Sequence, residues 1–183
     1  MSLSPFKKAL EWKILGSAII TGNIGGEEMG GMLIIYHSQQ FGNTKALAEA
    51  LAEGVRQAGA EVELINTNEH RVTLDKFLAA DAVGLGTPDY FSYLAGTIKT
   101  FFDDLYLWDQ EGKPVKGKPA ALFFSHGGGG KVRQPFESLA RRFFQQVGET
   151  VEAQRPVSEE ARKKCLAIGK ELVRESEKKP VKK

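Results

Sequence analysis

The sequence has little cysteine and little net charge, and each shortage argues against a class of protein. Its 183 residues include one cysteine, Cys165, so no disulfide can form within the chain. A chain without disulfides fits a reducing compartment, and we expect the cytoplasm. The lone cysteine and the three histidines show no metal-ligand spacing, so no metal site is expected. The formal net charge of +2 provides no strong field for nucleic acid or acidic partners.

Long apolar runs are also missing, and the first part of the chain differs from the rest. The apolar run over 14–20 is too short to cross a bilayer, so no membrane span is expected, and its flanks match a signal peptide only weakly. We treat residues 1–31 as an N-terminal extension, a short amphipathic helix followed by a Gly-rich linker. Met29 and Met32 could both be true starts. The extension is therefore either a misread upstream segment or one that packs on the domain or on a partner subunit.

From residue 32 the pattern alternates between strand and helix. Strands are predicted at 32–36, 61–65, 82–86, 118–124 and 150–153. Helices are predicted at 46–57, 74–79, 94–107, 135–147 and 158–177, and 178–183 is a basic tail. This alternation predicts an α/β fold over 32–177, a doubly wound five-stranded parallel sheet in three α/β/α layers. Ligands of such sheets bind beyond the carboxyl ends of the strands, which here precede three loops.

The first of these loops, Ser38-Gln-Gln-Phe-Gly-Asn-Thr44, has the chemistry of a phosphate site. Backbone N–H groups converge there at a helix N-terminus, where the macrodipole favours an anion. Hydroxyl and amide side chains add donors, and Gly42 lets the backbone approach a ligand closely. No Lys or Arg lies inside the loop, and an uncharged cradle of this kind suits a phosphate monoester. A helix-capping turn without a ligand is the alternative.

Other phosphate-binding motifs are absent. A P-loop has the pattern G-x-x-x-x-G-K-[ST], in which the second glycine is followed by Lys and then by Ser or Thr. Here Gly130-Lys131 is followed by Val132. A dinucleotide fingerprint is missing, because neither the first loop nor 84–86 supplies G-x-G-x-x-G. A phosphoacceptor domain would place Asp at its strand ends, where this chain has His37-Ser38 and Gly86-Thr87.

The pattern that remains resembles the flavodoxin family, whose FMN-phosphate loop runs Ser/Thr-x-Thr-Gly-x-Thr. This loop has one residue more before Gly42, with Gln40-Phe41 where a Thr is usual. The stretch from Gly86-Thr-Pro88 through Ala95-Gly96 resembles the NAD(P)H:quinone oxidoreductase branch, although Asp89-Tyr90 replaces Thr-Arg. The resemblance extends from residue 32 to about residue 173. It implies an FMN cofactor, and NAD(P)H as co-substrate.

The second and third loops supply the expected contacts to the flavin ring. Three aromatic residues lie within residues 90–93, where an electron-poor ring could stack on Tyr90 or Phe91. The third loop has four glycines and no aromatic residue, which would leave one flavin face open. His126 could bond the flavin or protonate a reduced quinone, or could simply cap the strand end. The expected FMN-binding residues are Ser38, Gln40, Phe41, Gly42, Asn43, Thr44, Thr87, Pro88, Asp89, Tyr90, Phe91, Ser125, His126, Gly127, Gly128 and Gly129.

These observations predict an FMN-dependent oxidoreductase that reduces quinones or similar small acceptors with NAD(P)H. The cofactor would carry the hydride chemistry, and His126 is the candidate catalytic residue. One alternative is a flavin electron carrier for a protein partner, and another is a flavodoxin-like domain without cofactor. A homodimer or a homotetramer is compatible with each of these interpretations.

Overall fold

The computed structural model describes residues 31–178, and the expectations for residues 1–30 and 179–183 lie outside this range. The strands are β1 (Met32–Tyr36), β2 (Val62–Asn66), β3 (Ala82–Tyr90), β4 (Tyr93–Leu94), β5 (Lys118–His126), β6 (Phe144–Gln146) and β7 (Val151–Gln154). The helices are α2 (Asn43–Gln57), α3 (Leu74–Ala79), α4 (Gly96–Gln110), α5 (Arg133–Ala140) and α6 (Glu159–Ser176).

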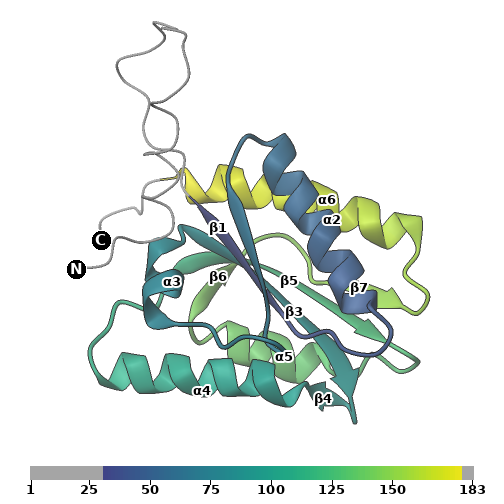
Figure 1. Ribbon diagram of the computed structural model, residues 1–183, viewed down its shortest axis with the longest axis horizontal. Coiled ribbons are helices and arrows are strands. Elements are labelled where there is room, and N and C mark those ends of the chain that lie inside the picture. The colour runs from purple at the N-terminus through teal and green to yellow at the C-terminus, as the bar shows by residue number, and fades with distance from the viewer. Residues whose placement is uncertain (1–30, 179–183) are drawn as a thin grey trace, which may run out of the picture.

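A parallel sheet with strand order β2-β1-β3-β5-β6 forms the middle layer (Figure 1). Beyond β5, the edge of the sheet is made by two short strands. The first part of β5 pairs with β6, and its last part, from Phe123 to His126, pairs with β7. Within residues 31–178 the sheet has seven strands, so the prediction of five is not confirmed. The α/β class and the parallel arrangement are confirmed.

Both additional strands arise where tertiary pairing overrides a helical pattern. The helix predicted over 135–147 ends at Ala140, and Phe144 pairs with Lys118 as the first residue of β6. Apolar residues spaced three or four apart over a short stretch fit a helix or a strand, and the open edge of β5 decides between them. The other addition, β4, folds back as an antiparallel hairpin on the end of β3. The helix predicted over 94–107 consequently begins at Gly96.

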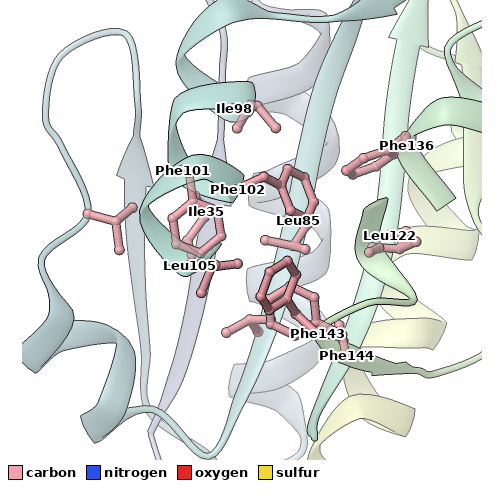
Figure 2. Close-up of a cluster of buried hydrophobic side chains, with 14 of the residues drawn as sticks. Ile35, Leu85, Ile98, Phe101, Phe102, Leu105, Leu122, Phe136, Phe143 and Phe144 are labelled. Atoms are coloured by element: carbon pink, nitrogen blue, oxygen red, sulfur yellow. The ribbon is translucent and has the colours of Figure 1, made fainter. Parts of the chain in front are cut away.

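Alternate residues of the central strands face two separate cores. On one face, Ile35, Leu85 and Leu122 pack with aromatic residues of α4 and α5 (Figure 2). On the other face, Ile34 and Phe123 pack against the apolar sides of α2 and α6, which lie next to each other (Figure 1). Because both faces are covered, the central strands are apolar over most of their length, and their carboxyl ends are the free edge for a site.

Candidate functional site

The three loops at the carboxyl ends of β1, β3 and β5 surround one pocket of about 300 Å³. Parallel strands bring these loops together, although they are far apart in the sequence. The lining residues are Ser38, Gln39, Gln40, Phe41, Gly42, Asn43, Thr44, Pro88, Asp89, Tyr90, Ser125, His126, Gly127 and Arg155.

The first loop ends in an uncapped helix N-terminus. Gly42 is the N-cap of α2 and has the left-handed backbone angle φ 67°, so a glycine is required there by conformation. A Cβ at this position would meet no protein atom within 4 Å. Among the described residues no side chain caps α2, and its first turn contains no acidic residue. The first N–H groups of α2 are therefore free to bind an anion.

Polar contacts hold this loop against its neighbours. The hydroxyl groups of Thr44 and Ser125 are 2.8 Å apart and buried, which joins the first loop to the third. Asn66 fixes the backbone of Ser38, because its Oδ1 accepts from Ser38 N at 3.0 Å and its Nδ2 donates to Ser38 O at 2.9 Å. The first loop is thus positioned before any ligand binds.

The second loop contributes one aromatic side chain to the pocket. Tyr90 lines it, and its hydroxyl lies 3.4 Å from Oε1 of Gln39. Phe91 does not line the pocket but is fully exposed at the tip of the β3–β4 hairpin, with φ 55°. Thr87 is buried, and its hydroxyl accepts from Ala95 N at 3.0 Å. Stacking by Tyr90 is therefore more compatible with this arrangement than stacking by Phe91.

Asp89 is held by backbone groups at the wall of the pocket. Its Oδ1 accepts from Ser92 N at 2.8 Å, and its Oδ2 lies 3.3 Å from Val132 N. Because both carboxylate oxygens already have backbone donors, Asp89 ties the hairpin to the segment that leads into α5.

The third loop places a buried imidazole beside a carboxylate. The His126 side chain is only 8% exposed, and its Nε2 lies 3.0 Å from Oε1 of Glu152 on β7. The other carboxylate oxygen of Glu152 accepts from Arg133 at 2.9 Å. His126 Nδ1 is buried and has no hydrogen-bond partner among the described residues. Buried polar atoms normally have a partner, and a ligand in the pocket is one group that could supply it.

A second histidine lies directly behind the first loop. Nδ1 of His37 is 2.8 Å from the Thr97 hydroxyl, and its ring contacts Tyr90 edge-on with centroids 5.6 Å apart. Burial lowers the pKa of His37 below the ordinary value of 6.5. A neutral His37 therefore supports Tyr90 through this edge-on contact.

Of the expected binding residues, twelve line the pocket, while Thr87, Phe91, Gly128 and Gly129 do not. The sequence analysis missed Gln39 and Arg155, which line it, and Glu152, which contacts His126. Gln39 lies inside the predicted loop, so its place in the sequence could have indicated it. Arg155 and Glu152 lie at the edge strand, and no local motif marks them.

Two further expectations concern absences. Within residues 31–178, no helix is both long and apolar enough to cross a membrane. The same residues contain no group of three or more His, Cys, Asp or Glu side chains placed to hold a metal ion.

Known proteins with similar sequences include flavodoxins and NAD(P)H dehydrogenases (quinone). A flavodoxin of Aquifex aeolicus (strain VF5) is 31% identical over 166 residues, which cover 79% of this chain and 85% of that protein. An NAD(P)H dehydrogenase (quinone) of Gluconacetobacter diazotrophicus is 32% identical over 124 residues, covering 53% of this chain and 59% of that protein. The match to the quinone dehydrogenase thus spans less than two thirds of its length.

Solved structures and family models agree on the fold. A flavodoxin from the domain Archaea superposes with a TM-score of 0.70 at 20% identity, covering 81% of this chain and 99% of that one. The family model described as flavodoxin matches residues 34–169, which include all three loops of the pocket. The protein therefore belongs to the flavodoxin family.

Proposed function

We propose that this protein binds FMN in the three-loop pocket and uses NAD(P)H to reduce quinones or similar small acceptors. Membership of the flavodoxin family implies a flavin cofactor. Family membership does not by itself establish that the flavin is FMN, which acceptor and hydride donor are used, or a cytoplasmic location. These points are part of our proposal.

The residues of the pocket fit a flavin mononucleotide. The uncapped N-terminus of α2 and the hydroxyl groups of Ser38 and Thr44 would hold the phosphate. Tyr90 offers an aromatic surface for the ring, and His126 Nδ1 is a buried nitrogen without a partner among the described residues. Bound there, the flavin would supply hydride chemistry that no side chain can perform.

The open third loop is the observation that favours a reductase over a carrier. No side chain larger than hydrogen projects from Gly127 to Gly130, and a Cβ at Gly128 or Gly129 would meet no protein atom within 4 Å. A flavin face left uncovered on this side is accessible to a nicotinamide and then to a quinone. The name NAD(P)H dehydrogenase (quinone) among the similar sequences supports the same activity.

The chain's own contribution to the reaction would come from His126. Glu152 fixes the orientation of the imidazole through Nε2, while Arg133 holds the carboxylate in place. With Nε2–H donating to Glu152, Nδ1 is the nitrogen left to exchange a proton with a ligand. Nδ1 accepts a proton when the ring is neutral and donates one when the ring is protonated, and a positioned general acid or base typically contributes about 100- to 10,000-fold to a rate.

An electron carrier for a protein partner is the second candidate, because flavodoxins are also among the similar sequences. The two functions differ in their reaction with NAD(P)H. In stopped-flow experiments on the FMN-loaded protein, we expect rapid bleaching of flavin absorbance on mixing with NADPH or NADH, and rapid recovery with a benzoquinone.

The variant His126→Gln tests the role of the imidazole in the same experiment. We expect a slower quinone half-reaction, with FMN affinity changed little. If the native protein is not reduced by either nucleotide, the reductase proposal fails and the carrier remains. Fast reduction with unchanged half-reactions in the variant would limit His126 to a structural role.

A further inference from the structure

Arg155 brings a positive charge to a pocket whose first loop contains none. It lies directly after β7, and its backbone N–H donates to His126 O at 3.0 Å, which fixes the start of its side chain beside the third loop. No other Lys or Arg lines the pocket in the described part of the chain. The uncharged phosphate cradle expected from the sequence therefore has a cation at its edge, supplied by a distant segment.

In the part of the chain that the structure describes, the guanidinium has no carboxylate partner. None of the ion pairs within residues 31–178 includes Arg155, whereas Arg133 and Arg71 each pair with acidic side chains. Asp89, which lines the same pocket, already accepts from two backbone N–H groups. Within the described residues, the charge of Arg155 is thus not neutralised by a carboxylate.

Two neighbours fix where this charge lies. The guanidinium carbon is 4.7 Å from the centre of the Phe41 ring, a cation–π contact that places it against the loop preceding α2. Gly127 leaves the space that the side chain occupies, because a Cβ there would lie 3.1 Å from Nε of Arg155. The absence of a side chain at Gly127 therefore makes room for Arg155, in addition to opening the flavin face.

We propose that Arg155 binds a phosphate group of the ligand held in this pocket. A planar guanidinium donates paired hydrogen bonds that match phosphate oxygens, and the free N–H groups of α2 face the same anion. This inference rests on the proposed cofactor pocket. The phosphate has two sources, the 5′-phosphate of FMN or a phosphate of NADPH. Contact with Phe41, a member of the phosphate loop, favours FMN.

The test measures flavin affinity without any turnover. Apoprotein of Arg155→Gln is titrated with FMN and with riboflavin, and binding is followed by quenching of flavin fluorescence. We expect the dissociation constant for FMN to rise about 10- to 100-fold, as charge-assisted hydrogen bonds are lost, with less than about a 3-fold change for riboflavin. Arg141→Gln removes the same charge from an exposed position outside the pocket and is expected to change neither ligand.

A second variant keeps the charge but moves it. In Gly127→Ala the new methyl group would displace the end of the Arg155 side chain, which is flexible, so the fold should tolerate it. Here too we expect the dissociation constant for FMN to rise more than that for riboflavin. Circular dichroism of each apoprotein verifies that the variants are folded.

The second source of phosphate has its own readout. If FMN and riboflavin are unaffected by Arg155→Gln but the KM for NADPH rises at least about 10-fold relative to that for NADH, Arg155 binds the 2′-phosphate of the dinucleotide. The proposal is overturned if FMN and riboflavin binding are weakened equally. It is also overturned if neither the flavin dissociation constants nor the KM values for NADPH and NADH change. The flavin titration is independent of reductase activity, so the proposed function can fail while the role of Arg155 stands.

Discussion

At the scale of single residues, the two histidines at the ends of β1 and β5 have opposite environments. His126 is paired with the carboxylate of Glu152, whereas His37 contacts a threonine hydroxyl and the edge of Tyr90. His37 Nε2 is buried without a partner in the described residues, so a proton there would be poorly solvated. His126, whose ring is oriented by a carboxylate, is for this reason the histidine that we propose for proton exchange, whereas His37 supports Tyr90.

Burial of His37 should make the stability of the protein depend on pH. Because its pKa is lowered below 6.5 in the folded state, the unfolded chain binds more protons just below that pH, and the free energy of unfolding falls as the solution becomes more acidic. One such group contributes at most about 1.4 kcal/mol per pH unit. Urea unfolding of the native protein and of His37→Asn, between pH 7.5 and 5, measures this contribution.

We expect the advantage of the native protein over His37→Asn to shrink as the pH falls, since asparagine can still bond Thr97 but does not titrate. The matched control is His70→Asn, at an exposed histidine. A difference between native protein and His37→Asn that stays constant over this pH range would contradict the assignment.

The residues of the site were predictable to different degrees. Those within the loops after β1, β3 and β5 could be named from the sequence, because the end of an apolar strand followed by glycine and hydroxyl residues is a local signal. Arg155 and Glu152 depend on how β7 pairs with the end of β5. This pairing is a long-range contact, and no local pattern encodes it.

At the scale of elements, helices α2 and α6 touch through glycines. A Cβ at Gly54 would lie 2.0 Å from the backbone oxygen of Leu166, and one at Gly169 would lie 2.3 Å from that of Leu51. Backbone atoms cannot move aside as a side chain can. The position of α2, and with it the free N-terminus at the pocket, therefore depends on this close contact.

Gly54→Ala should consequently destabilise the protein, although alanine is the better helix former by about 1 kcal/mol. We expect a net loss of about 1–3 kcal/mol in the free energy of unfolding, measured by urea denaturation, because the helices must separate. Gly96→Ala is the matched control, as a Cβ in the first turn of α4 meets no atom within 4 Å. Equal stability of both variants would mean that the helices are not in backbone contact.

Of the two strands that the sequence did not reveal, β6 is the one that replaces part of a predicted helix. Phe136, Leu139, Phe143 and Phe144 have helical spacing, yet the last two leave the helix and pack in the core beneath the sheet (Figure 2). The seven elements predicted between residue 32 and this helix all have the right type, with ends within about four residues of those observed. A periodic pattern identifies which residues are buried better than it identifies the backbone conformation that buries them.

At the scale of the whole molecule, the candidate site lies at one end of the sheet. The carboxyl end of the strands carries the pocket, with polar groups aligned before a ligand arrives. In an electron carrier we expect the flavin face beside the third loop to be covered. A covered ring still exchanges electrons at its edge, but a hydride donor cannot reach it. Whether this face is open decides between the two candidate functions.

Closing that face should separate cofactor binding from reduction. In Gly128→Trp the new side chain enters open space beside Gly127, which lines the pocket, and we expect its ring to reach a flavin bound there. Stacking of this kind is worth about 1–3 kcal/mol for nucleic-acid bases, so FMN should bind at least as tightly as in the native protein. Reduction by NADPH in stopped-flow experiments should slow at least about 10-fold, because the nicotinamide can no longer reach the ring. Gly128→Ala, which adds only a methyl group in the same open space, should behave like the native protein. If Gly128→Trp binds FMN and is still reduced at the native rate, the hydride donor approaches from the side of Tyr90 and the open third loop no longer supports the reductase.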